Sequence, residues 1–568
     1  MLLPIDFVDD ACRISLTREA CGGPHNSRKL LPRDDSTQLA QFIGFNRNNN
    51  SVDHWRELWN PVVLLGGAGT IGVVAAQWPM TRRVLGPWCL LALFLALTSW
   101  SDAGDANLTR GVFTISIAWG LLLIVAQWPQ RLSDFEQHEP RSLMSLPLHL
   151  VLLAGFCLTA SAGDLVTLFL GLQLVVFGAA VVTSEVHTSP TRERGITGIT
   201  PRWRVGLVSV DAVLAGLLLL GFVLLIAITG STRVETIAEA LRTSYLTRDA
   251  ARSAIVGGGS RLLTLALVFV GTALSGYAFA APFHPRGIDA VARASLSTAP
   301  SALLLPRAAA LLVWLRLWPN TLTSSESTAQ LLVGVLAGIT LVVPLLQARL
   351  ERNLVRQWTL LAVAQGGWLL LSITAWAFDR KTAPPSEAWP VIEWNLPNAA
   401  QAAWLWLLVD GVALIGLFGV LAYLQRRERR AEFLEDLQGL TKFEPLAAVC
   451  AAVCLLSLTG VPLLAGFWSR LFVGMAAMDV RGEWGPAQLL VPHTGLMALT
   501  ALAALSSVWS ASIAGRAVWT MFFGLPLGQP RPTGASSSLF VAVLASLMLL
   551  GCGLLPGPLL SWLCAPLD

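Results

Sequence analysis

Charged residues are scarce in this chain of 568 residues: only 13% of its positions are Asp, Glu, Lys or Arg, whereas 54% are hydrophobic. Soluble domains carry about 25% charged residues, so the composition excludes an ordinary soluble protein. The formal net charge of +4 is small and is spread over the loops. It gives no basis for binding nucleic acid, which needs a clustered basic surface. We expect an integral membrane protein surrounded by the lipid bilayer.

Sequence motifs for metal, redox and hydrolytic centres are also absent. The eight cysteines form no C-x-x-C pair, and no histidines stand at metal-ligand spacing, so iron–sulfur clusters and structural zinc are not expected. The chain has no G-x-x-x-x-G-K-[ST] phosphate loop and no nucleophile elbow. Cys450 and Cys454 lie one helical turn apart in an apolar run, where small packing residues are the commoner interpretation. We therefore expect no cofactor and no metal in this chain.

Long apolar runs occupy most of the chain. Runs of about 18 residues or more can cross a bilayer as α-helices, and they predict an all-α polytopic membrane protein with about fourteen spans. Residues 1–57 are polar, lack the apolar core of a signal peptide and are predicted to form a disordered tail. Residues 58–568 are predicted to form one transmembrane domain. The predicted spans are 61–79, 84–100, 111–129, 145–162, 164–184, 206–229, 262–281, 297–318, 329–348, 355–377, 398–424, 445–469, 490–513 and 538–563.

Arginines are unevenly distributed among the loops. One set of alternate loops is rich in arginine, and the opposite set is poorer apart from residues 230–261. The positive-inside rule makes the richer set cytoplasmic, so an even number of spans places both termini on the periplasmic side of an inner membrane. Many tryptophans lie near span ends, as Trp78 and Trp318 do, where interfacial anchoring is the expected role. The richer set contains Arg82, Arg83, Arg131, Arg141, Arg192, Arg194, Arg202, Arg204, Arg349, Arg352, Arg426, Arg427, Arg429 and Arg430.

A few polar side chains lie inside or at the edge of the apolar runs. Because an unpartnered polar group is costly in a bilayer, Gln173, Arg307 and Arg470 are expected to face a protein interior or a wet path. The alternatives are arginines that extend to the headgroups and a glutamine that only bonds neighbouring helices. Asp211 and Asp410 also lie deep in apolar runs, where they either pair with an arginine or move protons.

Two predicted spans contain helix breakers. Breaks within a membrane are tolerated where protein or water satisfies the freed backbone groups, and transporters use half-helix ends as sites for ions and charged side chains. A broken span that is followed by Arg470 therefore fits a transport-type interior, although a simple proline kink is the alternative. The breakers are Gly271, Gly276 and Pro282, followed by His284, in the first span, and Gly460, Pro462 and Gly466 in the second.

Five stretches carry a family pattern, in order, over roughly residues 60–525. They are SAGDLVTLFLGLQLVVFG from Ser161, PFH from Pro282 with Asp289, STAPSALLLPRAAALLVWLRL ending at Leu317, RNLVRQWTLLAVAQGGWLLL from Arg352, and DLQGLTKFEPLAAVCAAVCLLSLTGVPLLAGFWSR ending at Arg470. Together they resemble the antiporter-like membrane subunits of respiratory complex I and of Mrp-type cation/proton antiporters. The N type of bacterial NADH-quinone oxidoreductase looks most similar, because of the DLQGL and LLSLTGVPLLAGF segments and the N-L-x-R from Asn353.

The resemblance implies a fold of fourteen helices with two inverted five-helix repeats, in which helices 7 and 12 are broken. It also implies a membrane-arm subunit that contributes to proton translocation in an NADH-quinone oxidoreductase assembly. In such an assembly, NADH, FMN, iron–sulfur clusters and quinone belong to partner subunits, and the chain is an enzyme only as one subunit. The alternatives are a subunit of an Mrp-type antiporter or hydrogenase-like complex, and a structural spacer that does not conduct.

The ionisable residues of the family are replaced in this chain. In the family, a glutamate on the fifth helix faces a lysine on the seventh, and further lysines lie on the eighth and on the broken twelfth helix. By resemblance these positions are Gln173, Tyr277, Arg307 and Arg470. Arginine keeps its proton, glutamine has no titratable group, and tyrosine ionises only far above neutral pH. A double neutral replacement leaves no orphan charge, so the pattern predicts a retained fold whose own pumping is weakened.

Few other titratable groups lie in or near the predicted spans. The tenth helix of the family begins with lysine and arginine and later carries a histidine, where this chain has Val355, Arg356 and Gln365. Asp164 and Asp289 suit helix-end or loop positions, since anions are favoured at helix N-termini. The remaining candidates for a rerouted proton path are Asp211, Asp410 and His284.

Overall fold

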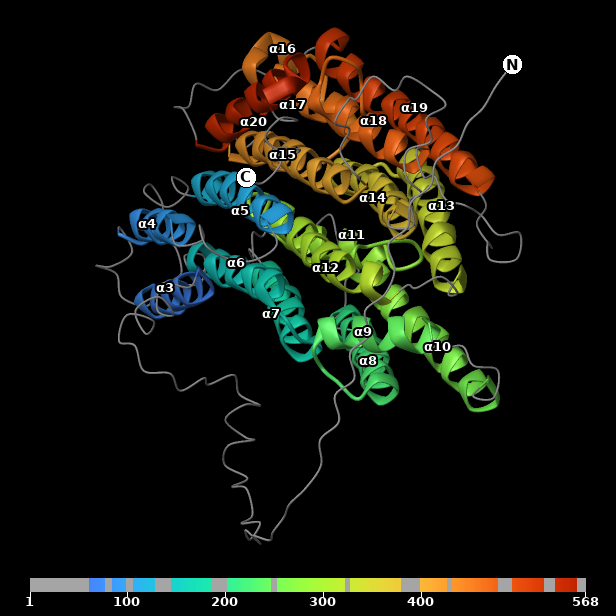
Figure 1. Cartoon of the computed structure of the whole chain (residues 1–568). Helices are drawn as coiled ribbons and strands as arrows, with labels where there is room; N and C mark the ends of the chain where they lie inside the picture. Colours follow the sequence, from blue (N-terminus) through green and yellow to red (C-terminus); the bar gives the residue numbers. More distant parts are fainter. Residues whose placement is uncertain are drawn as a thin grey trace, which may run out of the picture. The chain divides into compact units, whose positions relative to one another are not determined.

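The described part of the chain is helical throughout (Figure 1). In this computed structural model, the only other pairings among the described residues are two isolated β-bridges, so the all-α prediction is confirmed. All described helices belong to one unit, Arg56–Asp568. The predicted tail, residues 1–57, and most of the arginine-rich loops lie outside the described residues. The structure describes residues 61–76, 84–98, 106–127, 145–184, 202–246, 253–321, 327–379, 399–426, 432–478, 493–525 and 537–558.

Among the described residues, eight helices are long and apolar enough to cross a membrane, and six shorter apolar helices accompany them. Each predicted span coincides with a helix or with a pair of half-helices. The first elements are α3 (Pro61–Ala75), α4 (Leu85–Thr98), α5 (Ala106–Gln127), α6 (Ser145–Ser161), α7 (Leu165–Ser184), α8 (Arg202–Thr229), α9 (Val234–Leu246), α10 (Ser253–Tyr277), α11 (Pro285–Arg293) and α12 (Ala299–Thr321). They are followed by α13 (Ser327–Leu350), α14 (Leu354–Asp379), α15 (Ala399–Arg426), the 3-10 helix η3 (Leu434–Leu437), α16 (Leu440–Phe443), α17 (Pro445–Thr459), α18 (Ala465–Met478), α19 (His493–Phe523) and α20 (Ser537–Leu554).

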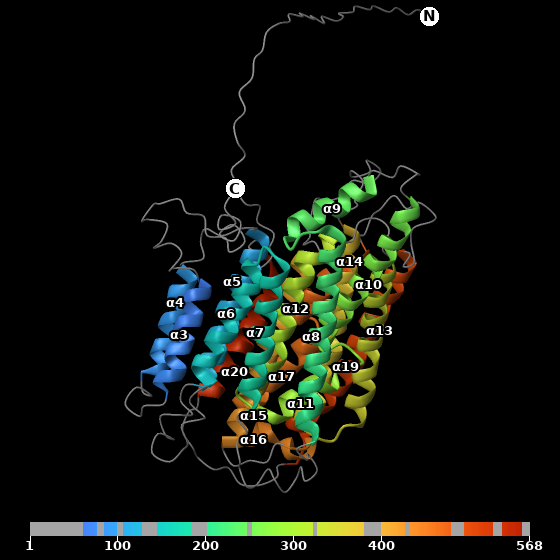
Figure 2. The same ribbon diagram turned by 90° about the horizontal axis from the view of Figure 1, so that it is seen from below.

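Helix α9 has no counterpart among the predicted spans. It lies in the 230–261 segment, which the sequence analysis treated as a polar connection. Its apolar residues Val234, Ile237 and Leu241 recur every three to four positions and are buried, whereas the residues between them are mostly polar. Such an amphipathic helix is too polar to cross a membrane but packs well along one face. In Figure 2, α9 lies at the end of the helix bundle opposite to α11 and α16.

Both predicted interruptions are present. Helix α10 ends at Tyr277 and α11 begins at Pro285, which stands at the first helical position, where the missing N–H is harmless. Helix α17 ends before Gly460, whose φ of 82° lies in the left-handed region that glycine adopts without strain. The chain restarts as α18 at Ala465. The proline-kink alternative is thereby excluded, because each span separates into two helices rather than bending.

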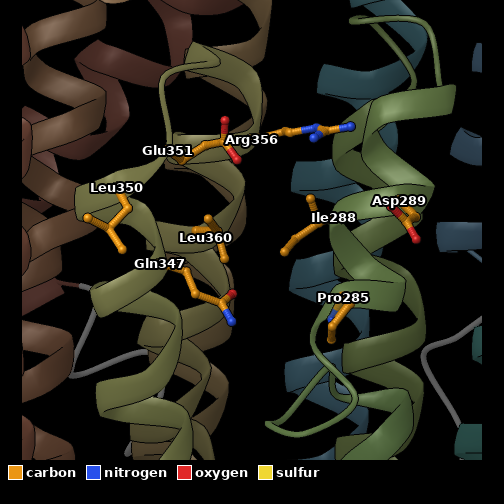
Figure 3. A pocket seen from close by; sticks show the side chains of 8 residues that line it. All are labelled: Pro285, Ile288, Asp289, Gln347, Leu350, Glu351, Arg356 and Leu360. Atoms are coloured by element: carbon orange, nitrogen blue, oxygen red, sulfur yellow. The ribbon is translucent and has the colours of Figure 1, made fainter. Parts of the chain in front are cut away.

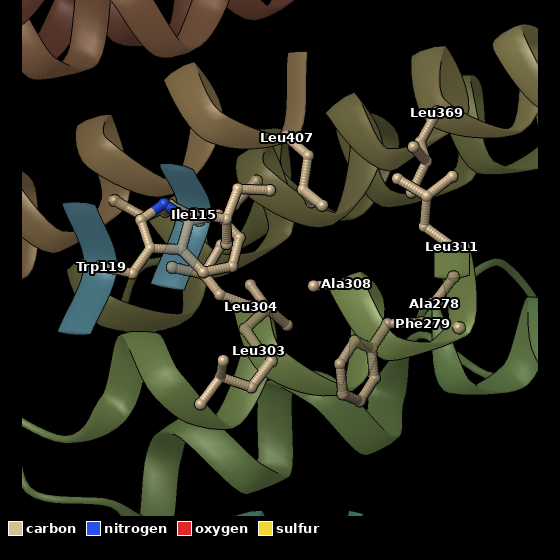
Figure 4. Close-up of a cluster of buried hydrophobic side chains, with 14 of the residues drawn as sticks. Ile115, Trp119, Ala278, Phe279, Leu303, Leu304, Ala308, Leu311, Leu369 and Leu407 are labelled. Atoms are coloured by element: carbon tan, nitrogen blue, oxygen red, sulfur yellow. The ribbon is translucent and has the colours of Figure 1, made fainter. Parts of the chain in front are cut away.

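Three helices form the centre of the bundle. In the apolar segments of α12, α14 and α15, 89%, 100% and 94% of the residues are buried, whereas in those of α8 and α19 only 28% and 33% are. Figure 4 shows α12 residues Leu304 and Ala308 packed among side chains of α5 and α15, such as Trp119 and Leu407. A polar group on a central helix therefore faces protein rather than lipid, and it must find its partner within the chain.

Candidate functional site

A buried ion pair joins the central helices. Arg307 of α12 is fully buried, and its Nη1 lies 3.3 Å from Oδ2 of Asp410 on α15. Its Nη2 donates a hydrogen bond of 3.4 Å to the carbonyl oxygen of Ala362 on α14. The guanidinium also lies 5.9 Å from the centre of the Trp406 ring, within the range of a cation–π interaction. Arg307 therefore does not extend to the headgroups, and Asp410 pairs with an arginine as one of its two predicted alternatives.

The ion pair is incompletely bonded. Among the described residues, Arg307 Nε and Asp410 Oδ1 are both buried without a hydrogen-bond partner. Asp410 also lies within electrostatic range of Arg470, so its ion-pair partner Arg307 is accompanied by a second cation at longer range. Arginine does not release its proton, which makes Asp410 the member of this group that can exchange one. The unpartnered Oδ1 is the atom at which a proton can be added without first breaking a hydrogen bond.

Arg470 of α18 closes the gap between two half-helices. Its Nη1 donates to the carbonyl oxygens of Gly466 at 2.7 Å and Ser457 at 3.3 Å, and its Nη2 donates to that of Leu458. The last carbonyls of a helix lack partners within the helix and carry its negative dipole. The end of α17 therefore stabilises a fixed cation. This arrangement requires glycine at 466, because a Cβ there would lie 1.8 Å from the Ser457 carbonyl oxygen.

Gln365 of α14 orients the same arginine. Both Nε and Nη2 of Arg470 donate to Gln365 Oε1, each over 3.1 Å. Gln365 Nε2 in turn donates to Ser510 Oγ of α19 at 3.0 Å. Gln365 stands where the resemblance places a histidine. Its amide oxygen accepts hydrogen bonds from the charged guanidinium of Arg470. Arg470 is buried and does not extend to the headgroups.

A neutral pair lies between α7 and α10. Gln173 Nε2 donates to Tyr277 Oη at 3.0 Å, and Tyr277 is fully buried. The structure thus brings together the two positions that the resemblance assigns to a glutamate and a lysine. Both side chains are uncharged at neutral pH. Their hydrogen bond joins α7 to α10.

Arg286 lies beside this neutral pair, and the sequence analysis missed it. It is the second residue of α11 and forms an ion pair with Asp211 of α8. Its Nη1 donates to the carbonyl oxygen of Gly276 at 3.1 Å, and its guanidinium lies 5.3 Å from the centre of the Tyr277 ring. The signal was available, because Arg286 follows a predicted break in the same way that Arg470 does. Asp211, like Asp410, pairs with an arginine.

His284 directly precedes α11, and Asp289 lies in the middle of this helix. His284 Nε2 is 2.7 Å from Gln347 Oε1 of α13. A cavity of about 360 Å³ lies between α11 and the α13–α14 connection, and Figure 3 shows Arg356 reaching across it toward α11. Asp289 lines this cavity from the middle of α11, rather than from a helix end. The other lining residues are Pro285, Ile288, Gln347, Leu350, Glu351 and Leu360.

Asp164 has the helix-end role that was predicted for it. Its Oδ2 accepts a hydrogen bond of 3.1 Å from the backbone N–H of Thr167 in the first turn of α7, and its Oδ1 accepts one of 2.6 Å from the Thr167 hydroxyl. This is the usual geometry of an N-cap. Asp164 therefore stabilises α7 and is separate from the arginine–carboxylate clusters.

A second buried polar cluster escaped the sequence analysis. His149 of α6 lies 3.0 Å from Ser301 Oγ of α12 and 3.4 Å from Gln127 Nε2 of α5. Ser145 Oγ donates to Gln127 Oε1 at 3.0 Å. All four side chains are buried. A histidine inside a predicted span was the available signal, and its hydrogen bonds tie the first turn of α6 to α5 and α12.

Sequence and fold comparisons agree with this architecture. Residues 394–492 match the family described as NADH:quinone oxidoreductase/Mrp antiporter, TM. NADH-quinone oxidoreductase subunit N 1 of Sorangium cellulosum (strain So ce56) is 29% identical over 507 residues, which cover 87% of each protein. A chain of respiratory complex I from Thermus thermophilus with bound aureothin has a TM-score of 0.62 and 21% identity, over 88% of this chain and 98% of its own length. A chain of the Mrp complex from Dietzia sp. DQ12-45-1b has a TM-score of 0.64 and 18% identity, over 91% of this chain and 96% of its own. Residues 394–492 thus carry the pattern of the NADH:quinone oxidoreductase/Mrp antiporter family, and over most of its length the chain is similar to a protein named NADH-quinone oxidoreductase subunit N 1.

Proposed function

We propose that this chain is a membrane-arm subunit of an NADH-quinone oxidoreductase-like assembly and contributes to its proton translocation through Asp410. The observation that carries the proposal is the buried carboxylate of Asp410, which forms an ion pair with Arg307 and lies within electrostatic range of Arg470. Buried ionisable groups in membrane proteins usually mark ion or proton pathways. The likeness over most of the chain to a protein named NADH-quinone oxidoreductase subunit N 1 supports the choice of assembly. NADH, FMN, iron–sulfur clusters and quinone would then be held by partner subunits.

The finer architecture belongs to the same proposal. The eight long and six shorter apolar helices would cross the bacterial inner membrane as fourteen spans, with both termini on the periplasmic side. Two sets of five spanning elements can be recognised, and in each set the fourth element is interrupted. This parallel supports an inverted repeat. The sets are α6, α7, α8, α10 with α11, and α12, followed by α13, α14, α15, α17 with α18, and α19.

Arg307 and Arg470 affect the protonation of Asp410 in different ways. Arg470 is fixed by Gln365 and by backbone carbonyls, so it supplies a constant positive potential. Arg307 has two longer contacts and an unpartnered Nε, so its pairing with Asp410 is the adjustable element. Quinone reduction in a partner subunit would change the field along the membrane arm. Asp410 would take up a proton when this field weakens its attraction to Arg307, and would release the proton when the pair forms again.

Asp410→Asn in the assembled complex tests the proposal. The substitution keeps the size of the side chain and removes the proton-exchanging group. We expect quinone reduction to continue in proteoliposomes while the proton-to-electron ratio falls. Asp164→Asn is the matched control, since asparagine also caps helices and this carboxylate lies apart from the clusters. A ratio unchanged by Asp410→Asn would remove Asp410 from the proton path.

Two alternatives have observations of their own. The complete hydrogen bonding of Arg470 favours a structural spacer with fixed charges, which would leave the proton-to-electron ratio insensitive to Asp410→Asn. The TM-score of 0.64 to a chain of an Mrp complex favours an antiporter assembly. Purifying the tagged chain from native membranes separates the assemblies. Co-purification with iron–sulfur subunits favours the oxidoreductase, and co-purification with small antiporter subunits favours the Mrp type.

A further inference from the structure

The two broken helices are closed in the same way. In α10–α11, Arg286 of the downstream half-helix donates to the Gly276 carbonyl oxygen in the last turn of the upstream half-helix. In α17–α18, Arg470 donates to the Ser457 and Leu458 carbonyl oxygens. Each arginine is buried. Each half of the chain therefore places a permanent cation at a helix break, where the orphan carbonyls and the helix dipole favour it.

A carboxylate accompanies the cation in each half. Asp410 forms an ion pair with Arg307 and lies within electrostatic range of Arg470, and Asp211 forms an ion pair with Arg286. Asp211 is 28% exposed, whereas Arg286 is only 7% exposed. The carboxylate therefore reaches the edge of the bundle while the guanidinium stays inside. Of the two partners, Asp211 is the more exposed, and it stands at the start of the apolar segment Val210–Thr229 of α8.

The surroundings of Arg286 hold it in place. Its guanidinium lies 5.3 Å and 5.1 Å from the centres of the Tyr277 and Phe279 rings, and it also bonds the Gly276 carbonyl oxygen. Asp211 Oδ1 is the atom that meets Arg286 Nε in the ion pair. Arg286 thus has several contacts besides Asp211 that hold it in place, as Arg470 has hydrogen bonds to Gln365 and to backbone carbonyls.

We propose that the Asp211–Arg286 pair is a second proton-exchanging centre, with Asp211 as the proton carrier and Arg286 as its positioning residue. The centre rests on the proposed function and places a titratable group beside the uncharged Gln173–Tyr277 pair. A proton from water at the edge of the bundle binds a carboxylate oxygen of Asp211 and neutralises it. The charge of Arg286 is then uncompensated next to Tyr277 and the end of α10. Release of the proton to water restores the ion pair.

The test uses the assembled complex and a double neutral substitution. Asp211→Asn combined with Arg286→Gln leaves no orphan charge and preserves hydrogen-bonding groups on α8 and α11. We expect normal quinone reduction and a proton-to-electron ratio reduced to that of Asp410→Asn. Asp289→Asn, which changes a half-buried carboxylate on the same helix as Arg286, is expected to leave the ratio unchanged. If Asp410→Asn lowers the ratio and the double variant does not, the second centre is overturned while the proposed function stands. If neither variant lowers the ratio, the proposed function itself fails.

A spectroscopic measurement keeps the inference testable if the double variant does not assemble. Asp211→Glu retains the carboxylate and the ion pair, so it is expected to assemble. In infrared difference spectra triggered by quinone reduction, a protonation change at Asp211 gives a carboxylic acid band that shifts in frequency in Asp211→Glu. Identical carboxylic acid bands in the wild type and in Asp211→Glu would overturn the proposal.

Discussion

The ion pair between Arg307 and Asp410 predicts strongly non-additive stability effects. At the observed separation of 3.3 Å, two unit charges attract by about 5 kcal/mol when the effective dielectric constant is about 20. Removing one partner of a buried pair costs about 3–5 kcal/mol, because the other charge is left uncompensated. We expect a loss of about 3–5 kcal/mol for Asp410→Ala, which strands Arg307 beside the positive charge of Arg470. Arg307→Met should cost less, because Asp410 keeps an attraction to Arg470.

The double variant Arg307→Met with Asp410→Leu removes both partners of the ion pair, so its stability can be compared with those of the single variants. It replaces both charges by apolar groups in a region that is already apolar (Figure 4), and such replacements are often neutral or stabilising. We therefore expect a stability within about 1 kcal/mol of the wild type or above it. The measurement is reversible unfolding of the purified chain in mixed micelles. A double variant no more stable than Asp410→Ala would refute the coupling and the electrostatic reasoning.

Three further substitutions test the site. Gly466→Ala should destabilise the chain by about 3 kcal/mol or more, because the new Cβ would lie 1.8 Å from a carbonyl oxygen of α17. Gly474→Ala on the same helix should be close to neutral in the same unfolding assay, because its Cβ would lie 3.5 Å from the Thr500 side chain, an ordinary van der Waals contact. Gln365→Leu should cost about 1–3 kcal/mol, since it removes the acceptor of two hydrogen bonds from a buried guanidinium, and equal thermal stability would count against that role. Gln173→Glu together with Tyr277→Lys places a charged pair where a neutral one now lies; we expect the double variant to assemble better than Gln173→Glu alone and to raise the proton-to-electron ratio, and an unchanged ratio would mean that this part of the chain does not limit pumping.

The sequence predicted the elements whose signals are local. Apolar length located the spans, and the two breaks followed from glycine and proline inside apolar runs, as at Gly460 and Pro462. Two predicted boundaries were wrong. Helix α10 begins at Ser253, ahead of its apolar segment Arg261–Tyr277, because helical hydrogen bonding does not end where hydropathy falls. Helix α19 extends to Phe523 because its apolar segment itself continues to that residue, beyond Arg516.

The pairings within the site could not be predicted in the same way. Asp410 lies 103 positions from Arg307, and only the packing of α12 against α15 brings them together. The sequence left open whether each buried aspartate pairs with an arginine or moves protons, because residue type alone does not identify a partner. Arg286 was missed because its short helix lies between two predicted spans and resembles a polar loop. Its counterpart Arg470 was found because the apolar run continues to it.

The arginine at the α17–α18 break has a geometric requirement as well as an electrostatic one. Arg470 reaches Gln365 on one side and the carbonyl oxygens of Ser457 and Gly466 on the other, which requires the wide, planar array of donors of a guanidinium. Lysine keeps the charge but concentrates its three donors at one point, so it would leave some of these buried acceptors without a partner. We therefore expect Arg470→Lys to lose about 1–3 kcal/mol of stability in the unfolding assay although the charge is conserved. If the lysine variant were as stable as the wild type, charge alone would account for this position, and the bridging of the helix break by hydrogen bonds would have to be abandoned.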